Sequence, residues 1–419
     1  MTELNAIDPQ TMKEAKLPRQ DWILLPLLSL LTLILLAAFS DFVAGWWFPS
    51  SEDGLARCFV KGDVTGNAPA IPNSVCSEKN AESPFLAEYR FNSCGYRAGM
   101  GCGRKPLGSY RIVVIGSSMA MGLYVPREMS FAALLPEELS KQTGRKIEVY
   151  NEARGGKFRG GQFPARDSPE HFDEVLAADP DAILWIVTPM DIENMSFEDP
   201  GPAVQAAVLR VPATGAQGSR LVVAWKKLRV AVANGSVLAK LRYRWEQSKS
   251  GLVLKHVLYE NEGQDRYVRA YLKNEDDAGF LRTERSGKWQ SLLETFQRYA
   301  ANFEGQAKAA GVPFAAVLVP NRAQAAMISM GRWPAGYDPY RLDDEIRAII
   351  VSHGGAYVDI LPDFRNVPDP EQYYFPVDGH LDAGGHKMVA ALLAKQLTGG
   401  AVPAFRVNAQ PNVSLERGQ

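Results

Sequence analysis

Short apolar runs alternate along most of the chain with segments whose apolar residues recur at helical spacing. The apolar runs are residues 111–116, 146–151, 182–187, 313–319 and 356–360. Helical spacing occurs at residues 131–143, 286–310, 339–353 and 383–397. Because the runs are continuous rather than alternating, they predict strands buried on both faces. Strands separated by helices predict a parallel sheet, in which functional sites form at the carboxyl ends of the strands.

The longest apolar segment precedes all of these strands. Residues 22–39 read WILLPLLSLLTLILLAAF without a charge, and apolar residues resume after Asp41 up to Phe48. At a rise of about 1.5 Å per residue, a helix here nearly spans a bilayer core. Basic residues precede it and acidic residues follow it, so the positive-inside rule leaves the N-terminus in the cytoplasm and exports residues 49–419. A cleaved signal peptide is the alternative. We expect an uncleaved anchor, because the stretch is long and lacks a small-x-small site.

All cysteines lie between this segment and the first predicted strand. They are Cys58, Cys76, Cys94 and Cys102. An even number of cysteines just outside a membrane predicts two disulfides in an oxidising compartment. Three pairings are possible, and the sequence does not choose between them. A zinc site is the alternative, but neither a CxxC pair nor a nearby histidine supports it, so we expect no metal.

Composition changes along the chain suggest five regions. They are a cytoplasmic tail at 1–20, an anchor at 21–48, a loop-rich extension with the cysteines at 49–105, an α/β domain at 106–398 and a disordered tail at 399–419. The chain is 46% hydrophobic and 22% charged, which is typical of globular proteins. A formal net charge of −1 argues against nucleic acid as a partner.

The α/β domain contains an insertion at about 192–285 that is predicted to be helical and basic. Residues 217–256 include nine Lys or Arg and one acidic residue, Glu246, with apolar residues interleaved. Contact with anionic lipid headgroups or an anionic polymer is one interpretation. A helix pair packed on the domain with a solvated basic face is the other, which we favour.

Three segments that are distant in the sequence would converge at the sheet edge. Ser118 follows a strand at a strand-to-helix turn, where backbone N–H groups face a developing oxyanion. The segment YNEARGG at 150–156 closes the second strand, and its glycines let a backbone N–H approach. Asp378 and His380 precede the last helix, which Asp382 can cap. The Asp378 carboxylate can hold one imidazole nitrogen and leave the other to take the serine proton.

Several neighbouring polar residues have simpler interpretations. Ser117 is expected to serve as a cap or turn residue, Asn151 as a strand-end turn residue and Asp191 as a structural hydrogen-bonding group. His386 lies within the last predicted helix, where packing or surface exposure is expected.

The ordered set GSS, N-x-x-x-G-G and D-x-H-L resembles the SGNH/GDSL hydrolase superfamily. The stretch NSCGYRAGMGCGRKPLGSYRIVVIGSSMAMGLYV is similar to the lead-in of membrane-anchored bacterial members, including those similar to alginate O-acetylation proteins. The segments YVDILPDF and YYFPVDGHLDAGGH resemble their final block, so the resemblance covers roughly residues 92–191 and 311–398. It implies a three-layer α/β/α, flavodoxin-like domain with a central, mostly parallel sheet on one N-terminal transmembrane helix.

The resemblance also implies roles for individual residues. Ser118 matches the nucleophile, with His380 as the base and Asp378 as its orienting acid. The backbone of Ser118 and of Gly156, or Gly155, matches the oxyanion donors. No metal or organic cofactor is implied.

Two positions depart from the family pattern. Ser117 replaces the aspartate of G-D-S, and Met190 replaces the asparagine of the third block, whose amide would donate to the oxyanion. A methionine side chain has no N–H. Loss of one such donor costs about a hundred- to a thousandfold in rate. Thr188, Asn194 and Asn321 are the candidates to replace it.

These features together predict a single-pass protein of the bacterial inner membrane with a periplasmic hydrolase domain. We expect it to be a serine esterase or O-acyltransferase that acts on ester groups of a polysaccharide, peptidoglycan or lipid. A transferase would also need an acyl donor, so a membrane-bound acyl donor is a further expected partner. A lipid esterase or thioesterase is one alternative. The other is a catalytically degenerate SGNH-fold protein that binds a glycan or organises a complex, and Met190 is the best argument for it.

Overall fold

The computed structural model describes residues 21–47, 54–59, 70–154, 169–195, 248–274 and 277–401. Three segments expected from the sequence lie wholly or mostly outside these residues. They are the cytoplasmic tail, the basic insertion and the C-terminal tail. The chain divides into two compact units. One comprises residues 1–48 and 221–254, and the other comprises residues 49–220 and 255–419.

The smaller unit is built on one apolar helix, α1 (Asp21–Trp47). Its residues Leu24–Trp47 have a mean hydropathy of 2.2, and 6% of the most apolar window is buried. The helix is therefore long and apolar enough to cross a membrane, a property that a signal sequence near an N-terminus shares. Within this unit the Asp41 carboxylate accepts a hydrogen bond from the Ser250 N–H at 3.0 Å.

The larger unit contains all the strands of the described residues. They are β1 (Val75–Glu78), β2 (Ala87–Arg90), β3 (Ser109–Ile115), β4 (Lys146–Asn151), β5 (Ala182–Val187), β6 (Phe314–Leu318) and β7 (Ala356–Tyr357). The last five form one sheet in the order β4-β3-β5-β6-β7, and every pair is parallel. Counted within the sheet, this is the order 2-1-3-4-5 of flavodoxin-like folds. The predicted fold class is confirmed.

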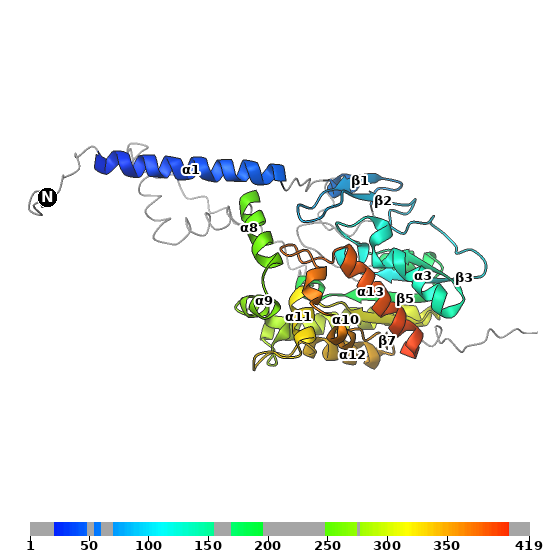
Figure 1. The fold of residues 1–419 in the computed structure, drawn as a ribbon. Coiled ribbons are helices and arrows are strands. Elements are labelled where there is room, and N and C mark those ends of the chain that lie inside the picture. Colours follow the sequence, from blue (N-terminus) through cyan, green and yellow to red (C-terminus); the bar gives the residue numbers. More distant parts are fainter. Residues whose placement is uncertain are drawn as a thin grey trace, which may run out of the picture. The chain divides into compact units, whose positions relative to one another are not determined.

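Helices follow the strands. They are α2 (Ser118–Met121), α3 (Phe131–Thr143), α4 (Pro169–Ala177), α5 (Pro189–Asn194), α8 (Lys249–Glu260), α9 (Gln264–Tyr271), α10 (Gly287–Ala309), α11 (Arg322–Met330), α12 (Arg341–His353) and α13 (Ala383–Gln396). The four predicted helical segments are present as α3, α10, α12 and α13. Helices α3 and α13 pack against each other on one side of the sheet, and α10 and α12 pack against each other on the other side (Figure 1). The unit is therefore a three-layer α/β/α sandwich.

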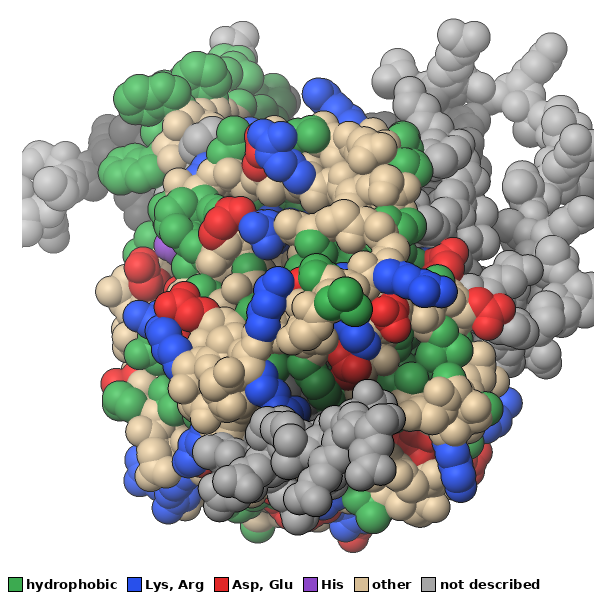
Figure 2. Space-filling model, turned by 90° about the vertical axis from the view of Figure 1, so that its right-hand side faces the viewer, with side chains coloured by type: hydrophobic (Ala, Val, Ile, Leu, Met, Phe, Trp, Pro, Cys, Tyr) green, Lys and Arg blue, Asp and Glu red, His purple; other side chains and the backbone are tan. Residues whose placement is uncertain are grey.

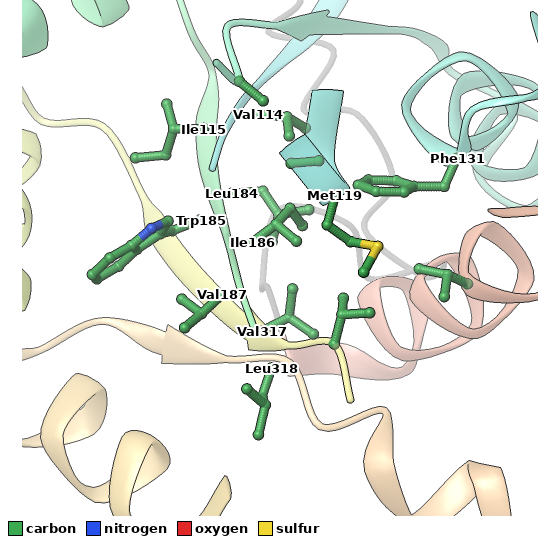
Figure 3. Close-up of a cluster of buried hydrophobic side chains, with 14 of the residues drawn as sticks. Val114, Ile115, Met119, Phe131, Leu184, Trp185, Ile186, Val187, Val317 and Leu318 are labelled. Atoms are coloured by element: carbon green, nitrogen blue, oxygen red, sulfur yellow. The ribbon is translucent and has the colours of Figure 1, made fainter. Parts of the chain in front are cut away.

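The core lies on both faces of the sheet. Trp185 points to one side of β5, where it stacks on Phe296 of α10 with the ring centroids 4.9 Å apart. Met119 and Phe131 lie on the other side, among side chains of β3, β5 and β6 (Figure 3). Each fully buried side chain of this size stabilises the fold by about 1.5–3 kcal/mol relative to exposure. The two-sided burial explains why the strand sequences are continuously apolar.

The cysteine-containing extension is more ordered than the sequence analysis expected. Strands β1 and β2 form an antiparallel hairpin, and buried residues of this hairpin join the main hydrophobic core. Cys58 is bonded to Cys76, and Cys94 is bonded to Cys102. The sequence of β1 does not predict this hairpin, because its exposed residue Val75 is apolar and its buried residue Glu78 is charged. In the structure, residues alternate between buried and exposed along both strands. That alternation is the period of a strand with one buried face.

The last strand is shorter than predicted. The apolar run at 356–360 pairs with β6 only over Ala356 and Tyr357. The Val358 N–H still donates to the Ala316 carbonyl at 2.9 Å, and a helical turn then begins at Leu361. Val358 and Ile360 are apolar because they are buried in the core, and not because they extend the strand.

The surface carries charges of both signs. On the face drawn in Figure 2, Lys and Arg side chains are interspersed with Asp and Glu side chains. This mixture accompanies the formal net charge of −1.

Candidate active site

The candidate nucleophile lies on a tight turn after β3. Gly116 has a φ of 152°, and a Cβ at this position would lie 2.8 Å from the Ile186 carbonyl oxygen. Ser117 is the N-cap of α2, and Ser118 is the first residue of that helix. The first turn of a helix leaves its N–H groups without intrahelical acceptors. The turn therefore presents the Ser118 hydroxyl and main-chain donors at the carboxyl edge of the sheet.

The Asp378–His380 segment is a compact loop before α13. The Phe375 N–H donates to the His380 carbonyl at 2.8 Å, and the Gly379 N–H donates to the Phe375 carbonyl at 2.9 Å. Gly379 has a φ of 85°, a backbone conformation that is unfavourable for a residue with a side chain. Asp382 caps α13 by accepting the Gly385 N–H at 2.7 Å, as the sequence predicts.

These two segments meet despite the distance between them in the sequence. The Ser118 Oγ lies 2.7 Å from the His380 Nε2, although the residues are 262 positions apart. The His380 Nδ1 lies 2.5 Å from the Asp378 Oδ1, which also accepts the His380 N–H at 3.2 Å. The carboxylate requires a proton on Nδ1, so Nε2 of the neutral ring is free to accept the serine proton.

The surroundings of His380 favour its protonated form. Burial lowers the pKa of the imidazole, but the nearby carboxylates of Asp378, Asp191 and Glu78 outweigh burial and hold the pKa above its ordinary value. The side chain of His380 is 14% exposed and that of Asp378 is 21% exposed, so solvent screens the pair weakly. An imidazolium formed by proton transfer from the serine is therefore stabilised.

Ser117 and Asp191 form a second polar pair beside the nucleophile. The Ser117 hydroxyl makes a hydrogen bond with the Asp191 carboxylate, and no side-chain capping bond from Ser117 to α2 is present. Asp191 also accepts the Thr188 N–H at 2.7 Å in a capping box at the start of α5. Burial raises the pKa of Asp191 to about 6, while these hydrogen bonds oppose the rise. Ser117 thus occupies the expected cap position, but its side chain binds Asp191 instead.

The end of β4 lies beside the nucleophile turn. The Asn151 side chain donates to the Ala120 carbonyl at 2.9 Å, and the Arg154 N–H donates to the Gly116 carbonyl at 3.0 Å. Both Gly155 and Gly156, the expected source of a second oxyanion donor, lie outside the described residues.

Met190, which stands where the family pattern has an asparagine, is 53% exposed on the first turn of α5. Of the candidates to replace that amide, Thr188 accepts the Asp191 N–H at 3.2 Å. Asn321 caps α11 and donates to the Tyr271 hydroxyl at 2.9 Å. Asn194 is exposed at the end of α5. Thr188 and Asn321 are therefore already engaged in hydrogen bonds.

Tyr124 belongs to this site, although the sequence analysis did not identify it. Its ring meets the His380 ring edge-to-face, with the centroids 5.6 Å apart and an interplanar angle of 86°. Its φ of 67° is rare for a residue with a side chain. The Tyr89 hydroxyl accepts the Tyr124 N–H at 2.9 Å, and Arg97 donates to the neighbouring carbonyls of Gly122 and Val125 at 2.6 and 2.8 Å. No sequence pattern marks such a contact, because it depends on a strained turn held by distant residues.

A pocket of about 480 Å³ adjoins the Asp378 loop. Its walls include Met190, Asn321, Asp378 and the aromatic rings of Tyr259 and Tyr271. The described residues contain no group of three or more His, Cys, Asp or Glu side chains that could hold a metal ion. His386 is buried between α13 and α3, where it stacks on Phe131 with the centroids 5.7 Å apart, and burial lowers its pKa to about 3. It therefore packs in the core.

No protein-family model and no curated protein matches the chain. Solved structures with a similar fold include the following two. One is the crystal structure of TesA, at 11% identity and a TM-score of 0.33, covering 69% of this chain and 98% of that one. The other is a protein from Slackia heliotrinireducens described as an SGNH hydrolase, at 13% identity and a TM-score of 0.29, covering 69% and 98%. At these TM-scores we base the function on the residues of this chain.

Proposed function

We propose that this chain is a membrane-anchored, periplasmic SGNH-type serine esterase or O-acyltransferase that acts on ester groups of a cell-envelope glycan or lipid. One observation carries the proposal: the Ser118 Oγ lies 2.7 Å from the His380 Nε2, whose Nδ1 lies 2.5 Å from the Asp378 carboxylate. A hydroxyl, an imidazole and a carboxylate in this order are the groups that nucleophilic acyl transfer requires.

The first half of the proposed reaction forms an acyl-enzyme. His380 Nε2 takes the Ser118 proton while Oγ attacks the ester carbonyl, and Asp378 stabilises the resulting imidazolium. Main-chain N–H groups at the Ser118 turn, and in our proposal at Gly156, hold the oxyanion. The imidazolium then protonates the leaving alkoxide, so that the ester C–O bond breaks and the acyl group remains on Ser118.

The second half releases the acyl group. His380 takes a proton from water or from a sugar hydroxyl, and the oxygen attacks the acyl carbonyl. The bond to Ser118 Oγ then breaks, and the imidazolium returns its proton to Oγ. Water gives hydrolysis, whereas the sugar gives O-acyl transfer. The apolar length of α1 supports action beside a membrane, where a membrane-bound acyl donor would be within reach.

A fluorophosphonate probe tests whether Ser118 is an activated nucleophile. We expect the full chain in detergent to label, Ser118→Ala to abolish labelling, and His380→Ala to slow it by at least about a thousandfold. Ser352→Ala is the matched control. Ser352 is exposed on α12, and its hydroxyl donates a local hydrogen bond to the Ile349 carbonyl. Equal labelling of the wild type and Ser118→Ala would contradict the proposal.

A second set of measurements identifies the substrate. The purified chain is incubated with an acetylated glycan, with a short-chain lipid ester and with a thioester, and acid release is measured. Acetate released from the glycan supports envelope glycan as the substrate. Release from the lipid or thioester alone points to a lipid esterase or thioesterase.

A non-catalytic glycan-binding or complex-organising protein is the second candidate, and Met190 favours it. The side chain is exposed on the wall of the pocket beside Asp378 and cannot donate a hydrogen bond.

A substitution at this position tests between the two candidates. We expect Met190→Asn to accelerate labelling by about tenfold, below the hundred- to thousandfold of an optimally placed donor. Met190→Leu is the apolar control and should not accelerate it. Labelling absent from all forms, with the protein folded, supports the non-catalytic function.

A further inference from the structure

We propose that Glu82 is a positioning residue of the active site, through which the disulfide-bonded extension holds the Asp378 main chain in place. This inference rests on the proposed function, because it assigns Glu82 to the Ser118–His380–Asp378 array. Glu82 lies in the loop between β1 and β2, almost 300 positions before the Asp378 main chain.

The local structure of this loop points Glu82 inward. The Asn80 side chain accepts the Glu82 N–H at 2.8 Å, which fixes the turn. The Glu82 side chain is 1% exposed. Burial of a carboxylate is costly unless its oxygens accept hydrogen bonds, so the partners of this group must be well placed.

Within the part of the chain that the structure describes, three donors meet the Glu82 carboxylate. The Asp378 N–H donates to Oε2 at 2.8 Å, and the Val377 N–H donates to Oε1 at 2.9 Å. The His256 Nδ1 lies 2.8 Å from Oε1. Because the carboxylate can only accept, Nδ1 carries the hydrogen. Two of the three donors are therefore main-chain groups of the loop that carries the catalytic aspartate.

These bonds fix the main chain of Asp378, from which its carboxylate projects toward His380. The Val377–Asp378 peptide sets the direction in which the Asp378 carboxylate leaves the chain. That carboxylate must lie within hydrogen-bond reach of Nδ1 to hold the imidazole in the correct tautomer and orientation. Without Glu82 the two N–H groups would lose their acceptor, and the loop would gain freedom where about 1 Å of misplacement costs up to a hundredfold in rate.

The adjacent residue, Ser83, contacts the tyrosine that packs against the imidazole. The Ser83 hydroxyl donates to the Tyr124 carbonyl at 3.1 Å, and the Tyr124 ring packs against the His380 ring. One turn of the extension thus holds both the loop that carries Asp378 and the residue that packs on His380. The extension is in this view a part of the active site and more than a linker to the anchor.

The test compares Glu82→Ala and Glu82→Gln with the wild-type full chain. The fluorophosphonate labelling rate is measured from pH 5 to 9, and hydrogen–deuterium exchange is followed in peptides covering residues 374–382. Glu88→Ala is the matched control, because Glu88 lies on β2 of the same hairpin with a side chain that is 50% exposed.

We expect Glu82→Ala to slow labelling by up to about a hundredfold. Glu82→Gln, which keeps one acceptor oxygen, should slow it by about tenfold. The pH at half-maximal labelling should also fall in Glu82→Ala, because a displaced Asp378 no longer raises the His380 pKa. A variant that is only partly unfolded should label a smaller fraction of the protein, with the pH of half-maximal labelling unchanged. Exchange in residues 374–382 should rise in Glu82→Ala and stay at the wild-type level in Glu88→Ala.

Each contrary outcome has a separate meaning. Unchanged exchange in Glu82→Ala overturns the contact itself, whether or not the chain reacts with the probe. Faster exchange with unchanged labelling and an unchanged pH midpoint overturns the positioning role alone. A wild-type chain that never labels overturns the proposed function, and the catalytic role of Glu82 falls with it.

Discussion

At the scale of single residues, the site depends on opposing electrostatic effects on one imidazole. Burial disfavours the charged ring, whereas three carboxylates favour it, and the balance holds the His380 pKa above its ordinary value. Only the neutral ring can accept the Ser118 proton. Activity should therefore rise with pH as the ring loses its proton, and the rise should lie above the pH at which an ordinary histidine titrates.

Replacing the orienting carboxylate should change both the height and the position of this profile. In Asp378→Asn the maximal rate should fall by roughly 10⁴-fold, the loss that a wrong tautomer causes in serine proteases. The midpoint should move to lower pH, because the main group that raises the His380 pKa has lost its charge. The measurement is the probe-labelling rate against pH. Asp382→Asn is the control, since asparagine also caps a helix. A midpoint that stays in place would contradict this account.

At the scale of elements, the strand-to-helix turn after β3 places the nucleophile. The turn was predictable, because an apolar run ending in Gly-Ser-Ser before a second apolar segment indicates a strand that stops at a helix. Why the turn needs Gly116 was not predictable. The reason is the Ile186 carbonyl on the neighbouring strand, and the sequence does not show which strand is the neighbour.

A side chain at Gly116 should therefore disturb the turn. In Gly116→Ala the new Cβ would lie 2.8 Å from both the Ile186 carbonyl oxygen and the Ala120 Cβ, at a φ of 152°. We expect a loss of about 1–3 kcal/mol in the free energy of unfolding and slower labelling of Ser118. Thermal unfolding in detergent measures the loss of stability. Gly305→Ala on the exposed face of α10 has open space around the new Cβ and should instead gain up to about 1 kcal/mol. Equal midpoints for the two variants would refute this prediction.

At the scale of the whole molecule, the larger unit joins an α/β sandwich to a disulfide-bonded hairpin. The parallel sheet followed from the alternation of apolar runs and helical patterns. The hairpin did not, because loop-forming residues dominate residues 49–105 and the apolar residues of β1 do not alternate in phase with its burial. The cysteine count predicted two disulfides, but their pairing needed the spatial positions of the four residues.

The two disulfides should differ in their contribution to stability. The bond between Cys58 and Cys76 closes a loop of sequence separation 18, and the bond between Cys94 and Cys102 closes one of separation 8. In the loop-entropy account the longer loop is worth about 3 kcal/mol and the shorter one somewhat less. Thermal unfolding of the Cys58→Ser/Cys76→Ser and Cys94→Ser/Cys102→Ser double variants measures both. The reverse order would show that native-state contacts, and not loop entropy, dominate.

The sequence by itself determined the main strands and helices of the α/β domain, its parallel sheet and the chemical groups at the ends of the strands. These follow from hydrophobic spacing and local turn chemistry, which act over a few residues. The motifs suggested that Ser118 and His380 meet, and the tertiary structure gave the 2.7 Å distance between them. Only the tertiary structure decided the other contacts: Ser117 with Asp191, Tyr124 with the imidazole and Glu82 with the Asp378 main chain. Such contacts join positions that are tens to hundreds of residues apart. They form because burial of the core brings the strand ends together, and no local pattern in one sequence encodes that convergence.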